Sequence, residues 1–227
     1  MMFGKALSRV AIGFAVLMMF SLLIVRNVSA IDDELNLPSQ PIRIEVSNAT
    51  ESYFNTKLMD VPSGYDVANG TYLGWCVDVR AEMARSPATH QVFLYSSLNP
   101  PLELADEEWD MINYILNHKQ GAAIDIQQAI WYFIRMDGNY TPTSQVAWNI
   151  IEDALANGEG FIPDYGQPVA VICYPIIVFP SEPYVQISII EIENTIIPEH
   201  SSPIVLVLMI LTIFTAAAML SRKKTLT

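Results

Sequence analysis

The alternation of apolar and polar side chains predicts strands on both sides of the middle of the chain. Apolar residues alternate with polar ones, or run without interruption, over strand lengths bounded by Pro, Gly and Asn. The expected strands are residues 41–47, 71–79, 91–97, 169–179 and 184–192. The fourth is apolar on both faces, as in a buried strand, whereas the fifth alternates.

Between the two groups of strands, the spacing of apolar residues becomes that of amphipathic helices. One helix is expected from an Asp106 cap to Gly121, a second from Asp125 to Gly138, and a third from a Thr141 cap to Gly158. Strands, a helical block and strands again predict an α+β domain. The expected architecture is an antiparallel sheet or barrel with a three-helix insert.

The two ends of the chain have the patterns of export and membrane segments. Residues 1–30 form an apolar leader that ends in Val28-Ser29-Ala30, which predicts a signal peptide. Residues 203–221 are uncharged and precede a basic tail, residues 222–227, which predicts a C-terminal transmembrane helix with the tail in the cytoplasm. Residues 31–195 are then an extracellular domain at the cell surface, followed by a juxtamembrane segment, residues 196–202.

The juxtamembrane segment contains Pro198-Glu199-His200. It resembles the Pro-Glu-Phe type of carboxy-terminal sorting signal, with His200 in place of Phe. That resemblance implies that a membrane transpeptidase removes the span and attaches a lipid. An uncleaved single-pass anchor accounts for the same residues, and both alternatives place the domain at the outer face of the membrane.

Charge limits the partners of the expected extracellular domain. All 24 Asp and Glu lie between residues 31 and 202, together with 6 of the 12 Lys and Arg, so this region carries 6 minus 24, or −18. Such a surface repels nucleic acid, and we expect no nucleic-acid partner. Three Asn-x-Thr sequons, at Asn48, Asn69 and Asn139, are candidate glycosylation sites in this region.

The chain has two cysteines, Cys76 and Cys173, and both lie in expected strands. In an exported protein the simplest expectation is a disulfide between them, and a buried free thiol is another. The second expected helix begins with two consecutive glutamines. Gln128 can bond back to the Asp125 cap. Gln127 has no such explanation, and a buried amide without partners costs stability.

Cys76 and Gln127 together resemble the internal thioester domains of bacterial surface adhesins, of the Thr-Gln-x-Ala type. The two motifs read Trp75-Cys76-Val77-Asp78 and Ile126-Gln127-Gln128-Ala129-Ile130-Trp131. The family's Thr is Ile126 here. The resemblance implies a thioester between Cys76 and Gln127, with Gln128 as the runner-up. Such a bond persists only where water is excluded, and we expect the aromatic side chains of Trp75, Trp131 and Tyr132 to cover it.

The same resemblance implies covalent attachment to an amine-bearing surface ligand. A cysteine that attacks a glutamine amide releases ammonia and leaves a thioester, which an amine can open. This is single-use binding and not enzymatic turnover. The alternative function is a surface structural or ligand-binding module held by a Cys76 to Cys173 disulfide, without covalent chemistry.

The sequence offers little support for a cysteine hydrolase, a metal site or a phosphate-binding site. A cysteine hydrolase needs a histidine base, but His118 is expected at a helix end, His200 lies next to the membrane, and His90 precedes a strand. The histidines and cysteines show no metal-ligand spacing, and phosphate-binding glycine loops are absent from the sequence. We therefore expect no metal and no cofactor.

Overall fold

The computed structural model describes residues 35–79, 85–136, 138–176 and 186–195, which lie within one compact unit, Glu34–Ile197. The strands are β1 (Ile42–Ser47), β2 (Phe54–Met59), β3 (Gly70–Cys76), β4 (Thr89–Ser96), β5 (Pro168–Pro175) and β6 (Ser188–Glu193). The helices are the short η1 (Leu102–Leu104), α2 (Trp109–Asn117), α3 (Ala123–Phe133) and α4 (Gln145–Asn157). The predicted leader, sorting segment, transmembrane helix and tail lie outside the described residues. Within the described ranges, no helix has the length and apolar character needed to cross a bilayer.

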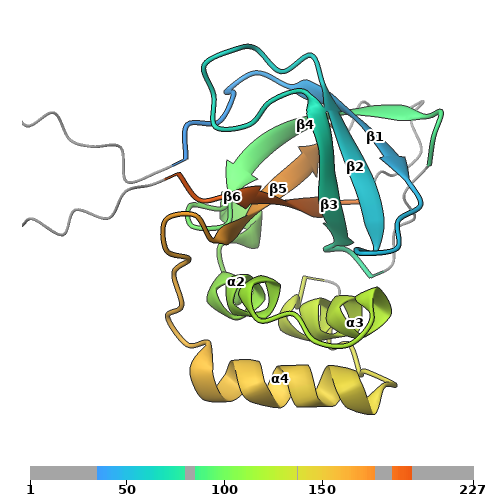
Figure 1. Ribbon diagram of the computed structural model, residues 1–227, viewed down its shortest axis with the longest axis vertical. Coiled ribbons are helices and arrows are strands. Elements are labelled where there is room, and N and C mark those ends of the chain that lie inside the picture. The colour runs from blue at the N-terminus through green and yellow to red at the C-terminus, as the bar shows by residue number, and fades with distance from the viewer. Residues whose placement is uncertain (1–34, 80–84, 137, 177–185, 196–227) are drawn as a thin grey trace, which may run out of the picture. The chain divides into compact units, whose positions relative to one another are not determined.

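The six strands of the described region form a closed antiparallel barrel in the order β1-β2-β3-β6-β5-β4, with β4 pairing with β1 (Figure 1). Closure leaves no strand edge exposed to other chains. The expectation of an α+β domain with an antiparallel barrel and a three-helix insert is confirmed for this part of the chain.

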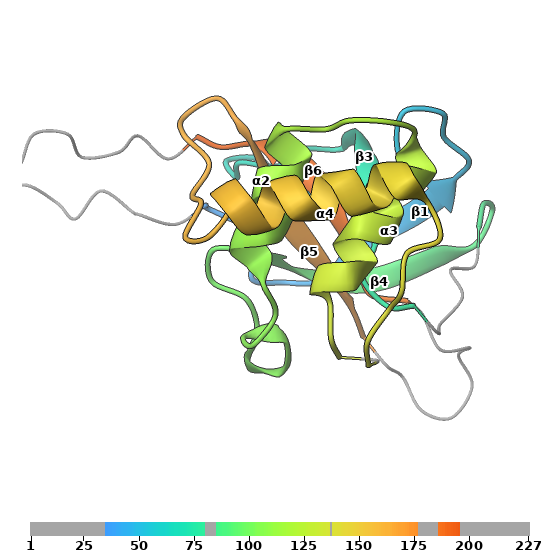
Figure 2. The ribbon, with the colours of Figure 1, turned by 90° about the horizontal axis from the view of Figure 1, so that it is seen from below.

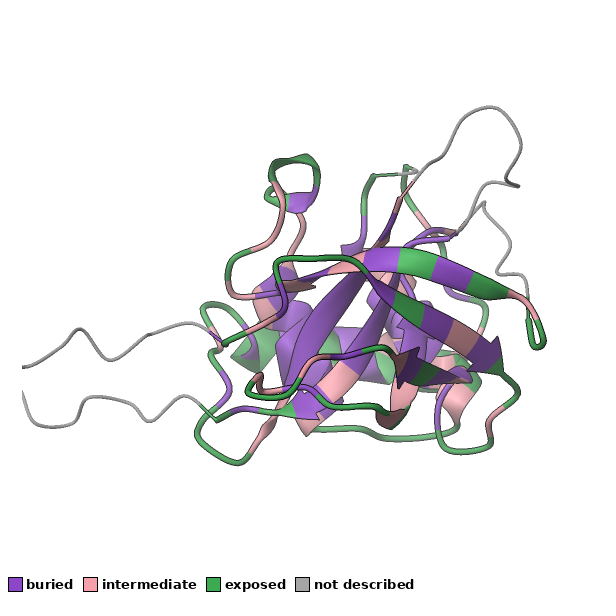
Figure 3. Ribbon diagram, turned by 90° about the horizontal axis from the view of Figure 1, so that it is seen from above, coloured by how far each residue is buried: buried purple, intermediate pink, exposed green. Residues whose placement is uncertain are grey.

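The barrel interior is filled by alternate residues of the strands, which Figure 3 shows as buried and exposed bands along β1 and β2. The buried residues of this interior cluster include Ile42, Ile44, Val46, Phe54, Leu58, Val92, Val171 and Ile190. The Phe54 ring of this cluster lies close to the main chain of Gly74 in β3, and a Cβ atom at Gly74 would lie 2.5 Å from the ring. Glycine is therefore required at this position if Phe54 keeps its place.

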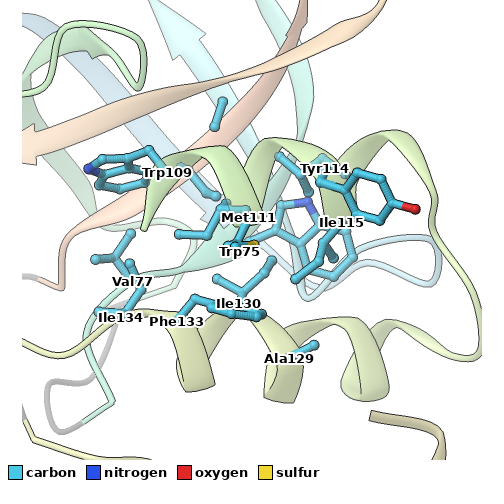
Figure 4. Close-up of a cluster of buried hydrophobic side chains, with 14 of the residues drawn as sticks. Trp75, Val77, Trp109, Met111, Tyr114, Ile115, Ala129, Ile130, Phe133 and Ile134 are labelled. Atoms are coloured by element: carbon cyan, nitrogen blue, oxygen red, sulfur yellow. The ribbon is translucent and has the colours of Figure 1, made fainter. Parts of the chain in front are cut away.

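The helices cover one side of the barrel (Figures 1 and 2). α2 and α3 lie between the barrel and α4, and α4 packs on their outer side. A second cluster of buried side chains fills the space between α2, α3 and the strands, and Figure 4 shows Trp75 of β3 and Val77, just after β3, among its members. Successive side chains of a strand point to opposite faces, so neighbouring residues of β3 contribute to both clusters: Trp75 to the one under the helices and Cys76 to the one inside the barrel.

Two details differ from the sequence expectations. β2 was not predicted, because its inward residues are Phe54, Thr56 and Leu58 and the polar Thr56 interrupts the apolar alternation. The expected helix caps are also wrong. α4 begins after Ser144 and not Thr141, with the Ser144 hydroxyl accepting from the N–H groups of Val146 and Ala147.

Candidate functional site

Cys76 is the last residue of β3 and is 2 % exposed. Its side chain belongs to the cluster inside the barrel, whereas its neighbours Trp75 and Val77 belong to the cluster beneath the helices. The strand alternation therefore turns the thiol away from the helices, although the main chain of Cys76 remains within reach of α3.

Gln127 in the first half of α3 pairs with the main chain of Cys76. The Cys76 N–H donates to Gln127 Oε1 at 2.8 Å, and Gln127 Nε2 donates to the Cys76 carbonyl oxygen at 2.8 Å. Gln127 is 0 % exposed, so these two bonds satisfy an amide that would otherwise be costly to bury. The glutamine without a local explanation in the sequence thus contacts the residue that the resemblance assigned to it.

The pairing exists because β3 extends past its neighbour. β2 begins at Phe54, which lies opposite Gly74, so β2 has no residue opposite Cys76. On the other side, Cys76 lies opposite Ser188 of β6, and the next N–H, of Val77, donates to Ile187. The N–H and C=O of Cys76 therefore face the vacant β2 side, where the Gln127 amide takes the place of a peptide group.

The Gln127 carbonyl is held close to Cys76 and polarised by it. Because Oε1 is 2.8 Å from the Cys76 nitrogen, the carbonyl carbon one bond away lies within about 4 Å of that nitrogen. An N–H donor on a carbonyl oxygen is the arrangement that stabilises negative charge when a nucleophile attacks the carbon. The nucleophile available is the thiol of the same residue.

Two further groups act on the thiol of Cys76. Its Sγ donates to Gln186 Oε1 at 2.9 Å. Burial raises the pKa of Cys76 well above its ordinary value, Arg85 opposes this effect, and the charge of Asp78 adds to it. The group is therefore a neutral thiol at pH 7, and not a free thiolate.

An aromatic group lies beside the pair. Trp131 is one helical turn after Gln127, and its ring contacts Tyr53 at 5.5 Å and Tyr140 at 5.2 Å between ring centroids. Burial raises the pKa of Tyr53. Tyr53 directly precedes Phe54, which lies opposite Gly74, so it lies next to the end of β3 that carries Cys76. Tyr53, Trp131 and Tyr140 are called the aromatic trio below; sequence reasoning named only Trp131, since the other two lie in loops without a distinctive pattern.

The two other expected shielding residues lie elsewhere. Trp75 is fully buried beneath the helices, and its Nε1 donates to Glu191 Oε1 at 2.8 Å. Tyr132 packs on Phe133 and on Trp148 of α4. Both belong to the helix-facing cluster, on the opposite side of β3 from the thiol.

The alternative disulfide is not formed, and both cysteines are free. Cys76 and Cys173 both lie opposite Ser188 of β6, from the two sides. Two strand spacings separate their Cα atoms by about 9 to 10 Å. A disulfide needs about 7 Å or less, so joining them would require β6 to leave its place between β3 and β5.

Cys173 gives a prediction for the pH dependence of stability. Burial raises the pKa of Cys173 from 9.0 to about 12. Above pH 9 the unfolded chain loses this proton while the folded chain keeps it, so the free energy of unfolding falls as the pH rises from 9 to 12. A Cys173→Ala variant should lose less stability over that range in denaturant titrations at pH 8, 9 and 10; an identical loss in both proteins would contradict the assignment.

The structure also describes the runner-up glutamine and the candidate glycosylation sites. Gln128 does not bond back to Asp125 as expected; its Oε1 accepts from the N–H of Thr143 at 2.7 Å and so ties α3 to the segment before α4. The three sequon residues Asn48, Asn69 and Asn139 are exposed. In the ranges that the structure describes, no cluster of three or more His, Cys, Asp or Glu could hold a metal ion.

Among known proteins, similarity is found only in the comparison with solved structures. No family model matches the chain, and no curated protein does. Its structure is similar to the N-terminal thioester domain of a surface protein from Clostridium perfringens, with a TM-score of 0.43 and 15% identity over 66% of this chain and 97% of that chain. A cysteine-to-alanine mutant of the Clostridium perfringens domain gives 0.41 and 13%, over 62% and 88%. Because these scores are low, the function proposed below rests on the geometry around Cys76.

Proposed function

We propose that this protein forms an internal thioester between Cys76 Sγ and the side-chain carbonyl carbon of Gln127, and uses it once to attach covalently to an amine. The observation that carries the proposal is the reciprocal pair of hydrogen bonds between the Gln127 amide and the main chain of Cys76. It holds the carboxamide against the main chain of the residue that carries the thiol, and both residues are buried, which supplies the proximity that this reaction needs.

The thioester forms when the Cys76 sulfur replaces the amide nitrogen on the side-chain carbonyl carbon of Gln127. The sulfur attacks the Gln127 carbon, the C–N bond breaks, and the amide nitrogen leaves as ammonia with the thiol proton. The Cys76 N–H stabilises the developing charge on Oε1. Because the pKa of Cys76 is raised, the thiol keeps its proton until the attack, so formation depends on placement of the sulfur rather than on a standing thiolate.

Opening of the bond fixes the ligand. A primary amine attacks the same carbon, the C–S bond breaks, and the sulfur takes the proton that the amine loses. The product is an amide between Gln127 and the ligand, with Cys76 returned to a thiol. The protein is consumed as an anchor, so we place it among covalent binding modules and not among enzymes.

The setting of this chemistry follows from the sequence. The predicted leader and the predicted C-terminal span would display the domain at the cell surface, attached to the membrane by the span or by a lipid after processing. Amines of neighbouring cells or of surface polymers are the partners available there. The charge of −18 between residues 31 and 202 favours cationic ligands such as lysine side chains.

A labelling experiment tests the proposal. A protein of residues 31–202 is incubated with a biotin-linked primary amine, and the site of attachment is mapped by peptide mass spectrometry. Label is expected on Gln127 in the natural sequence and in Cys173→Ser, and on no residue in Cys76→Ala. Equal labelling of Cys76→Ala would show that the thiol is not involved.

The aromatic trio gives a further prediction. Trp131→Ala removes the ring that packs on both Tyr53 and Tyr140, and this opens a path for water. Spontaneous hydrolysis of the thioester is expected to accelerate on the order of tenfold, because water exclusion protects reactive acyl groups. The measurement is the rate at which a thiol reagent gains access to Cys76 in the absence of amines. Tyr132→Ala, on the far side of β3, is the control and should leave that rate unchanged.

A further inference from the structure

Gln186 approaches Cys76 from the side opposite to Gln127. It lies just before β6 and is 4 % exposed. Since Cys76 lies opposite Ser188 and Val77 bonds to Ile187, Gln186 continues this register opposite Asp78. Its side chain therefore shares a face with Ser188 and reaches Cys76 along the diagonal.

Both ends of the Gln186 amide are engaged. Oε1 accepts from Cys76 Sγ at 2.9 Å, and Nε2 donates to the main-chain oxygen of Asp78. The second bond fixes the orientation of the amide, because the nitrogen end is held by a carbonyl that cannot donate. The oxygen end is consequently the one turned toward the sulfur.

Resting on the thioester proposed above, we propose that Gln186 is a positioning residue for thioester formation. It directs the thiol hydrogen toward itself, which leaves the sulfur lone pairs turned away from Gln186. An amide oxygen is too weak a base to take the thiol proton, so this contact orients the sulfur and does not activate it. Gln186 forms no covalent bond, and the departing ammonia comes from Gln127.

The two glutamines then divide the task. Gln127 is bound to the main chain of Cys76, and Gln186 is bound to its side chain. The carbonyl and the sulfur are thereby fixed with respect to one residue, so fluctuations of β3 move them together. Fixing both reactants in this way accelerates reactions between neighbouring groups, and small misplacements cost large factors in rate.

The test measures the rate of thioester formation and not only its presence. In a protein of residues 31–202, which contains the barrel and both core clusters, the thioester is opened with ammonia, which restores Gln127 and the thiol. Ammonia is then removed, and the return of the mass deficit of one ammonia is followed over time by intact mass spectrometry. The variants are Gln186→Leu and Gln186→Glu, with Ser188→Ala, the next inward-facing residue, as the control.

Gln186→Leu should form the thioester more slowly, on the order of tenfold. Burial favours the protonated form of the Gln186→Glu carboxyl, whose hydroxyl can donate to the Asp78 carbonyl while its other oxygen accepts from the thiol. This variant should therefore recover to within about threefold of the natural rate, as should Ser188→Ala. If Gln186→Leu does not fold, Gln186→Glu decides alone: a rate within that range supports the inference, and a tenfold loss overturns it.

Three other results would overturn it. The first is an unchanged rate in folded Gln186→Leu. The second is an equal slowing of the Leu and Glu variants, which would indicate a packing role. The third is a mass deficit that persists in Gln127→Ala, which would make Gln186 the acyl partner. A natural protein with no mass deficit would contradict the proposed function and this inference together. The first two results leave the thioester between Cys76 and Gln127 in place, whereas the third assigns the thioester to Gln186.

Discussion

Gln127→Ala is expected to abolish thioester formation completely, because the variant has no acyl group beside Cys76. The protein should show no mass deficit of one ammonia. After mild unfolding, both cysteines should react with an alkylating reagent, whereas only Cys173 reacts in the natural protein. Intact mass before and after alkylation measures this. Gln128→Ala is the matched control, since its Oε1 contacts Thr143 and Ser144 and not Cys76, so it should keep the deficit.

The same substitution is expected to destabilise the fold apart from the loss of the covalent bond. Without Gln127, the N–H and C=O of Cys76 lose their partners at the end of β3, and each unpaired buried group costs about 1–3 kcal/mol. The comparison is made between Cys76→Ala and Cys76→Ala/Gln127→Ala, because neither can form a thioester. A loss below about 0.5 kcal/mol in urea unfolding would mean that the main-chain pairing contributes little.

Trp75→Ala is expected to have the largest effect on stability, a loss of about 3–5 kcal/mol. The indole is fully buried in the cluster between the strands and α2 and α3 (Figure 4). Its Nε1 donates to Glu191, whose carboxylate also binds Lys119. Truncation leaves a cavity and removes one donor from that carboxylate. Denaturant unfolding of Cys76→Ala with and without Trp75→Ala measures the difference without interference from the thioester.

Trp75→Phe separates packing from shielding. It keeps most of the ring, so the stability loss should be smaller, about 1–2 kcal/mol, and the variant should fold. Because Trp75 lies on the opposite face of β3 from the thiol, hydrolysis of its thioester should match that of the natural protein. Hydrolysis as fast as in Trp131→Ala would instead assign Trp75 the shielding role expected from the sequence.

The sequence was informative where one element carries its own pattern. The three helices were expected within a few residues, because Trp109, Ile112 and Ile115 repeat at helical spacing and glycines follow the ends. The boundary at α4 was misplaced because Thr141 and Ser144 can both cap a helix, and only contacts decide between them. β2 was missed because the barrel accepts Thr56 at an inward position.

The site was predictable only in part, for a physical reason. Gln127 attracted notice because a buried amide needs partners and the helix offers none. The identity of that partner depends on where β3 extends beyond the end of β2. That position is a property of the assembled sheet and not of β2 or β3 alone. Gln186 reaches Cys76 only because β6 lies next to β3, and the order of strands in a barrel does not follow from alternation within each strand.

The most direct test of the thioester is the intact mass of residues 31–202, purified without reductant and measured before and after methylamine. We expect a mass lower by one ammonia than the sequence requires, which methylamine converts to the mass of the full sequence plus one methylene, with the added group on Gln127. A mass lower by two hydrogens, unchanged by methylamine and restored by a reductant, would contradict it and establish the Cys76 to Cys173 disulfide. The full sequence mass, unchanged by methylamine, would leave Cys76 a buried thiol and remove the basis for covalent attachment.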